Sequence, residues 1–301
     1  MVKNESSIIN KFFHHLRHGS LLHVYKTRKN TKRAEKRLRK WDGLSLGCEV
    51  IHKISPKTFM ILNKGSELDK FIYLRSFEND EQIFVNRYIK QGDTFIDIGA
   101  NTGLFALQAA RLTQENVYAF EPVETTCLKL KKNIQFNKIN NIIVEQIALS
   151  DKEGYAEMHI SDSGYDAWNS LAGPLAEGPT VIKKIKTTTL DTYVKAAGIS
   201  KVALIKIDVE GWETHVLKGG THFFQSGNAD VMLIEFTEKN LNMAGVNSET
   251  LYNAVQNCGF SLYTYDSKNN TLIPEKPGQV YVYANLIAVR NFSEALNRIR
   301  S

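Results

Sequence analysis

The chain has 301 residues, 43% of them hydrophobic, enough to bury a core in one domain of about 200–250 residues plus an extension. Cys48, Cys127 and Cys258 lie far apart without a C-x-x-C pair, so neither a disulfide framework nor a zinc motif is indicated. No apolar run approaches the roughly 18 residues that span a bilayer, and none has the length of a signal-peptide core, so we expect a cytoplasmic protein.

Positive charge is concentrated at the N-terminus: the whole chain has a net charge of +6, and residues 1–45 carry 12 Lys/Arg against 3 Asp/Glu. Residues 7–18 space apolar side chains as an amphipathic helix does, and the basic stretch Lys26–Lys40 follows. We therefore expect a basic helical N-terminal extension over residues 1–45. It is either a solvated arm or a surface for an anionic membrane or a polyanionic substrate, and its few aromatic residues make nucleic-acid binding the weaker alternative.

Residues 46–90, here called the lead-in segment, precede the main domain. Short strand-like pieces fill residues 47–74, with turn residues such as Asn63-Lys64-Gly65 between them. Glu81–Lys90 then has the pattern of a helix.

Residues 91–301 alternate strands and helices, which predicts a mostly parallel sheet with helices on both faces. The expected strands are Thr94–Ile98, Val117–Phe120, Ile142–Ile147, Val202–Asp208, Val231–Phe236, Ser261–Tyr265 and Val280–Val289. The expected helices are Gly103–Leu112, one beginning at Pro122, Trp212–Leu217 and Ser248–Cys258. A hairpin of Tyr155–Ile160 and Val181–Thr187, with a glycine-containing loop around Trp168, interrupts the alternation.

The turn after the first of these strands predicts a ligand site. Asp97, Gly99, Asn101 and Gly103 follow one another there, and glycine lets a ligand approach the backbone because it has no Cβ. The glycines lack the G-x-G-x-x-G spacing that holds a pyrophosphate, and the Asp97 carboxylate would repel phosphate and attract a cation. A positively charged nucleoside without phosphate fits best, which predicts S-adenosylmethionine, with Asp97 and Asn101 holding its amino and carboxyl groups.

The ends of the next two strands complete the expected cofactor site. Glu121 follows the second strand, where a carboxylate accepts hydrogen bonds from both ribose hydroxyls. An acid favoured by the following helix dipole is the alternative. We expect Ala148, after the third strand, to line the adenine site.

Two later strands supply candidate catalytic residues at the same edge of the sheet. Lys206 and Asp208 are two apart on a strand and therefore share a face. Asp208 is expected to act as the base or to orient the acceptor, with Lys206 tuning it; a structural ion pair is the alternative. Glu210 is a candidate to bind acceptor hydroxyls, and Glu235 is a second candidate base. Asp208, Glu210 and Glu235 could together bind Mg²⁺ or Ca²⁺, but their spacing does not require it, so no metal is predicted.

Five segments together resemble the FkbM family of S-adenosylmethionine-dependent methyltransferases: DTFIDIGANTG, AFEP, IALSD, KIDVEGWE and LIEF. The resemblance covers about residues 78–289. It implies a Rossmann-like class I methyltransferase fold with a seven-stranded sheet. It also implies O-methylation of hydroxyls, commonly on sugars or polyketides.

We therefore predict an O-methyltransferase that acts on a sugar, a glycan or glycolipid, or a related hydroxylated metabolite. A nucleic-acid methyltransferase that uses the basic arm is one alternative, although the Asn/Asp-Pro-Pro-aromatic motif of amino-group methylation is absent from the sequence. A non-catalytic binding module on the same fold is the other. The apolar face of residues 7–18 leaves open a homo-oligomer or a peripheral membrane contact.

Overall fold

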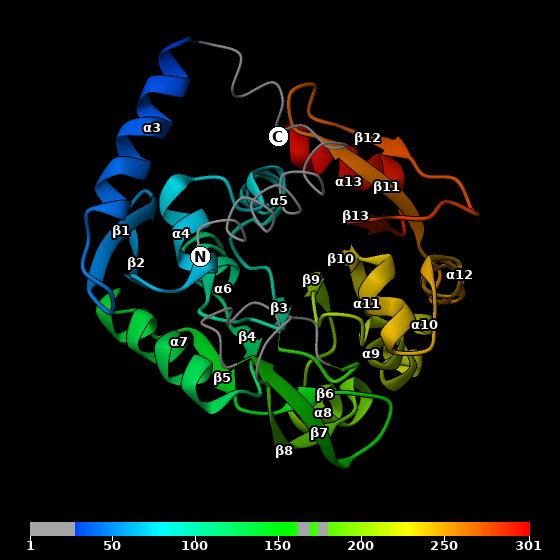
Figure 1. Ribbon diagram of the computed structural model, residues 1–301. Helices are drawn as coiled ribbons and strands as arrows, with labels where there is room; N and C mark the ends of the chain where they lie inside the picture. The colour runs from blue at the N-terminus through cyan, green and yellow to red at the C-terminus, as the bar shows by residue number, and fades with distance from the viewer. Residues whose placement is uncertain (1–27, 162–168, 174–179) are drawn as a thin grey trace.

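The computed structural model describes residues 28–161, 169–173 and 180–301 (Figure 1). The expected helix over residues 7–18 and the loop around Trp168 lie outside these ranges. Among the described helices, none combines the length and the apolar character that crossing a membrane requires.

The described residues form a central sheet of eight strands in the order β12-β11-β13-β10-β9-β3-β4-β5. The strands are β3 (Phe95–Ile98), β4 (Val117–Phe120), β5 (Ile142–Glu145), β9 (Val202–Ile207), β10 (Ala229–Phe236), β11 (Ser261–Asp266), β12 (Thr271–Pro274) and β13 (Ala284–Val289). Pairing is parallel from β5 through β10, and β13, β11 and β12 join antiparallel. This confirms the Rossmann-like, mostly parallel α/β fold.

The sheet has one strand more than the seven expected. The additional strand, β12, pairs with β11 at the sheet edge. It ends at Pro274, which lacks a backbone N–H and is tolerated in an edge strand. The expected last strand Val280–Val289 is also shorter, because β13 begins only at Ala284.

Helices cover both faces of the sheet and create two apolar cores. Side chains alternate along each strand, so Phe95 and Leu204 pack in one core while Ile96 and Ile205 pack in the other. Helices contributing to the first core are α4 (Glu67–Leu74), α5 (Asn79–Tyr88), α6 (Leu104–Thr113), α7 (Glu124–Phe136) and α13 (Phe292–Arg300). Helices contributing to the second core are α8 (Leu190–Ala196), α9 (Glu213–Gly219), α10 (Thr221–Gln225), α11 (Glu238–Met243) and α12 (Ser248–Asn257).

The lead-in segment packs on the first core. Strands β1 (Glu49–Ser55) and β2 (Thr58–Asn63) pair antiparallel, and the described part of the basic stretch lies in helix α3 (Arg28–Asp42) beside them (Figure 1). Trp41 near the end of α3 is 1% exposed, and its ring lies 5.1 Å from that of Tyr73. Burial of this indole anchors the described part of the basic extension to the domain.

The last helix of the described chain packs against the lead-in segment at α5. Helix α13 contacts α5, and the Arg298 guanidinium donates to the Tyr88 carbonyl at 2.7 Å and to the Asp93 carboxylate. A smaller sheet, β6-β8-β7, follows β5. It consists of β6 (Ala148–Leu149), β7 (Gly154–Ser161) and β8 (Thr180–Thr188). Its β7–β8 pair is the predicted hairpin.

Candidate active site

Asp97 is a deeply buried acid at the carboxyl edge of the sheet. It sits within β3, is 1% exposed, and neither of its carboxylate oxygens has a hydrogen-bond partner among the described residues. Loss of water around the carboxylate raises the pKa of Asp97 to about 6, although Lys206 acts in the opposite direction. A buried acid of this kind favours a cationic ligand.

The glycine turn is held tightly against its neighbours. Gly99 has φ +81°, and a Cβ there would lie 1.8 Å from the carbonyl oxygen of Asp208. Gly103 has φ +96°, and a Cβ there would lie 2.4 Å from Leu130 in α7. Both glycines are therefore required by close packing as well as by backbone conformation, a reason that the sequence pattern alone did not reveal.

Glu121 links the first two strand-end turns. Its Oε2 accepts from the Asn101 N–H at 3.0 Å, and its Oε1 accepts from the Val123 N–H at 2.9 Å, just before α7. Asn101 adopts φ +48°, uncommon for a residue other than glycine, and its Oδ1 accepts from the Thr102 N–H at 2.7 Å. Glu121 thus fixes the turn structurally, while its contact with ribose stays a prediction.

Ala148 lies in β6 and is 7% exposed, in a small apolar cluster with Val123. Close by in the chain, Ser150 accepts a hydrogen bond from Trp212 Nε1 at 3.0 Å. The Trp212 ring stacks on His215, with centroids 3.6 Å apart. The sequence analysis did not assign Trp212 to the site, and the role of Ala148 near adenine stays a prediction.

Lys206 and Asp208 share a face, as predicted, and form an ion pair. Lys206 Nζ lies 2.6 Å from Asp208 Oδ2 and 5.0 Å from the centre of the Phe105 ring. Lys206 also pairs in register with Asp97 on the neighbouring strand β3. The charge of Lys206 holds the pKa of Asp208 below its usual range, and the surrounding carboxylates raise the pKa of Lys206.

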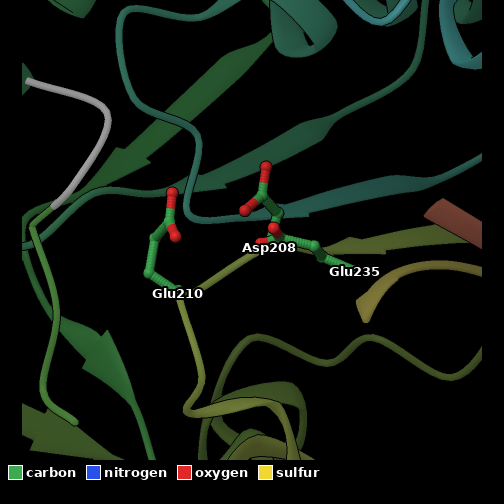
Figure 2. Close-up of side chains that lie close together, drawn as sticks. All are labelled: Asp208, Glu210 and Glu235. Carbon is green, nitrogen blue, oxygen red and sulfur yellow. The ribbon is translucent and has the colours of Figure 1, made fainter. Parts of the chain in front are cut away.

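Glu210 and Glu235 meet Asp208 from two directions (Figure 2). Glu210 lies on the turn after β9 at φ +56°, and its Oε2 accepts from Asn240 at 2.6 Å. Glu235 lies near the end of β10, where its Oε1 accepts from the Thr237 hydroxyl at 2.6 Å. Burial and neighbouring negative charges raise the pKa of Glu210 and of Glu235 well above the usual range.

The neighbouring Glu213 serves the turn itself. It is 1% exposed, and its Oε1 accepts from the N–H groups of Val209 and Gly211 at 3.1 and 3.2 Å. These bonds fix the backbone between β9 and α9, so that Asp208 and Glu210 are presented on a rigid turn.

Glu78 is a site residue that the sequence analysis did not assign. It precedes α5 at φ +43°, and its Oε1 accepts from Tyr283 and Asn285 at 3.2 and 3.3 Å. Its Oε2 is buried without a hydrogen-bond partner among the described residues. Burial raises the pKa of Glu78 to about 8, with Lys206 opposing that shift. The family resemblance begins at about this residue, but none of the five segments that carry it includes Glu78.

Most of the predicted residues are therefore brought together at one edge of the sheet. Asp97, Lys206, Asp208, Glu210 and Glu235 form an acidic group around a single described lysine, while Gly99, Asn101, Gly103 and Glu121 build the adjoining turns. Ligands of open α/β sheets bind at this carboxyl edge. The arrangement can bind a cationic ligand and orient or deprotonate a hydroxyl beside it.

The sheet order, with its last long strand antiparallel, and the acid–glycine turn after β3 define a class I methyltransferase fold. A comparison with family models makes the family explicit, because the model described as the methyltransferase FkbM domain matches residues 97–262. The chain belongs to the FkbM methyltransferase family, whose methyl donor is S-adenosylmethionine.

Curated relatives share part of this stretch. The hexuronic acid methyltransferase AglP of Haloferax volcanii is 31% identical over 139 residues, which cover 46% of this chain and 54% of that protein. The 2-O-methyltransferase NoeI of Sinorhizobium fredii is 25% identical over 48% of this chain and 67% of that protein. The 31-O-demethyl-FK506 methyltransferase FkbM of Streptomyces tacrolimicus is 27% identical over 50% of this chain and 68% of that protein. The match thus spans about half of the first relative's length.

Proposed function

We propose that this chain is an S-adenosylmethionine-dependent O-methyltransferase whose acceptor is a hydroxyl of a sugar, a glycan or a related hydroxylated metabolite. The observation that carries the proposal is Asp97, a 1% exposed carboxylate without hydrogen-bond partners among the described residues. A ligand amino group supplies both a positive charge and N–H donors, which such a carboxylate requires. A phosphate at the same place would be repelled.

The adjoining turns suit the rest of the donor. Glu121 follows the second strand and accepts the backbone N–H groups of Asn101 and Val123, which fixes its carboxylate at the carboxyl edge of the sheet. A carboxylate at this place would accept hydrogen bonds from the two ribose hydroxyls. The Gly99 turn and Asn101 would lie against the methionine part, and Ala148 against adenine.

The bound donor supplies a methyl group on a positively charged sulfur. Transfer forms a carbon–oxygen bond to the acceptor, breaks the sulfur–methyl bond, leaves a neutral thioether and releases the hydroxyl proton. The carboxylates of Asp208 and Glu235 are the groups that would orient the hydroxyl and accept this proton. Lys206 keeps Asp208 ionised, and a Glu210 oxygen lies within 4.8 Å of oxygens of Asp208 and Glu235.

The acceptor class is supported by the relatives. Two of them are named for hydroxyl methylation, and one is named for a hexuronic acid. Uronic acids and neutral sugars are therefore the first acceptors to try.

Calorimetric titration of S-adenosylmethionine and S-adenosylhomocysteine tests the cofactor part. We expect micromolar binding, about −8 kcal/mol, to wild type and at least tenfold weaker binding to Glu121→Ala. Glu124→Ala, which removes a nearby exposed acid, is the matched control and should bind as wild type does. A folded wild-type protein that binds neither molecule would refute the methyltransferase proposal.

Transfer of a labelled methyl group then tests the acceptor. Label should enter hydroxyls of the sugar panel, and Asp208→Asn and Glu235→Gln should each slow the transfer while cofactor binding persists. If the label enters RNA and no sugar, the acceptor is a nucleic acid and the sugar proposal is refuted.

A further inference from the structure

Three carboxylates converge beside the proposed methyl-transfer site. Asp208, Glu210 and Glu235 each offer one oxygen, and these oxygens all lie within 4.8 Å of one another (Figure 2). Asp208 and Glu210 come from the turn after β9, and Glu235 comes from the neighbouring strand β10. The three side chains thus surround one small space from two elements of the sheet.

Each of the three carboxylates is held in place by a donor from outside the group. The donor pairs, all at 2.6 Å, are Lys206 Nζ to Asp208 Oδ2, Asn240 Nδ2 to Glu210 Oε2, and Thr237 Oγ1 to Glu235 Oε1. Such donors fix the direction of a carboxylate while one oxygen remains to bind a ligand. Metal ligands are commonly oriented by partners of this kind.

The Glu235 side chain gives independent evidence for a ligand between the three carboxylates. Its side chain is 6% exposed, and Oε2 is buried without a hydrogen-bond partner among the described residues. A Glu235 carboxylate oxygen also lies within 4.8 Å of an Asp208 carboxylate oxygen. A buried carboxylate beside a second, partly buried one needs either a shared proton or a cation between them.

We infer that Asp208, Glu210 and Glu235 bind a divalent cation through one oxygen each. Oxygen ligands lie about 2.0–2.1 Å from Mg²⁺ and about 2.3–2.6 Å from Ca²⁺, so two oxygens on opposite sides of one ion are roughly 4–5 Å apart. The observed spread of up to 4.8 Å fits that span. Water or a substrate oxygen would complete the coordination, because Mg²⁺ and Ca²⁺ take about six or more oxygen ligands and the protein supplies three.

The ammonium of Lys206 does not remove the need for a cation. It compensates one negative charge, whereas Asp208, Glu210 and Glu235 bring three. Burial and mutual repulsion raise the pKa of Glu210 and of Glu235, which reflects the uncompensated negative charge. A divalent ion would relieve this repulsion.

The position of the cation suggests its use. A metal ion that binds an acceptor hydroxyl lowers the pKa of that hydroxyl and fixes its oxygen for attack. The proton released on methyl transfer would pass to water. This role rests on the methyl transfer proposed above, whereas binding of the cation does not.

Titration of the full chain with Mn²⁺, after removal of metals with a chelator, tests the site. The electron paramagnetic resonance signal of free Mn²⁺ falls as the ion binds, so the titration counts sites and gives the dissociation constant. We expect one bound Mn²⁺ per chain in wild type and at least tenfold weaker binding in both Glu235→Gln and Glu210→Gln. Glu249→Gln, which removes an exposed acid on α12, is the matched control and should bind Mn²⁺ as wild type does.

Circular dichroism and urea denaturation of the same samples check that each variant is folded, and S-adenosylmethionine is titrated separately. A folded wild type that binds no Mn²⁺ would overturn the inference, and so would equal Mn²⁺ affinity in wild type and both variants. The second result would leave a shared proton between Glu235 and Asp208.

These measurements distinguish failure of the cation site from failure of the methyltransferase proposal. Mn²⁺ binding without binding of S-adenosylmethionine would support the metal site and refute the methyltransferase proposal. Methyl transfer that is equally fast with a chelator and with Mg²⁺ would refute the catalytic role of the cation.

Discussion

Replacing Asp97 with asparagine should stabilise the fold while it weakens cofactor binding. The folded state raises the pKa of this 1% exposed carboxyl from 3.8 to about 6, mainly by desolvation. The folded chain therefore holds the proton more tightly than the unfolded chain does. Ionised Asp97 costs stability at neutral pH, and this cost develops as the pH rises from about 4 to about 6.

The size of the effect follows from the pKa shift. One pKa unit corresponds to about 1.4 kcal/mol, so a shift of roughly two units amounts to ~3 kcal/mol. Asp97→Asn should gain up to this much in free energy of unfolding at about pH 7.5, and the gain should vanish below about pH 4. Asp42→Asn, at a largely exposed acid, is the control and should change stability little at either pH.

Cofactor binding should change in the opposite direction. Loss of a charge-assisted hydrogen bond costs about 1.5–3 kcal/mol, which predicts roughly 10–150-fold weaker binding of S-adenosylmethionine. Wild-type affinity should also fall about tenfold per unit as the pH drops below about 6, because the cationic amino group requires ionised Asp97. The Asp97→Asn variant should lack that dependence.

Urea denaturation and calorimetry, each over a range of pH, measure these effects. A variant that is less stable than wild type at neutral pH would show that Asp97 has a structural partner and would refute the reasoning. Unchanged affinity for S-adenosylmethionine would remove Asp97 from the cofactor site.

Two further substitutions test the packing and the charge of the site by urea denaturation. Gly99→Ala should lower the free energy of unfolding by ~3 kcal/mol or more, because the new Cβ would lie 1.8 Å from the Asp208 carbonyl oxygen. Gly92→Ala, at φ +89° with open space around it, is the control and should lower it by only about 1–2 kcal/mol. Equal losses in the two variants would contradict the close packing at Gly99. Lys206→Met should lower the free energy of unfolding by about 3–5 kcal/mol at neutral pH, because it leaves Asp208 without its ion-pair partner. The loss should be smaller in acid, where Asp208 can take up a proton. A loss independent of pH would argue against the ion pair.

The buried centre of the sheet was predictable because its strands are nearly continuous apolar runs. Val117–Phe120 has the expected bounds, and the β9 strand differs from its prediction only at Asp208. Helix α4 was missed, although Ser66 and Asp69 form a readable N-terminal cap in which the Asp69 N–H donates to Ser66 Oγ at 3.2 Å. Strand β12 was beyond prediction, because its short segment becomes a strand only by pairing with β11.

The candidate site also has parts that the sequence predicts and parts that it does not. Lys206 and Asp208 could be placed together because residues two apart on a strand share a face. The roles of Tyr283, Asn285 and Asn240 depend on tertiary contacts between distant segments, and no local pattern encodes such contacts. The sequence analysis named Glu210 and Glu235 as residues that could act together, because they lie near the ends of two strands. The separation of their carboxylate oxygens depends on the tertiary structure.

The attachment of Glu78 to Tyr283 and Asn285 also determines when the site can form during translation. These partners are separated by 205 and 207 residues. At about 5–20 residues per second, the ribosome makes Tyr283 roughly 10–40 s after Glu78. The Arg298 contact with Tyr88 is made later still, over a separation of 210 residues. The lead-in segment therefore lacks these partners until residues 283–298 have been made, and the acidic side of the site is completed only after that.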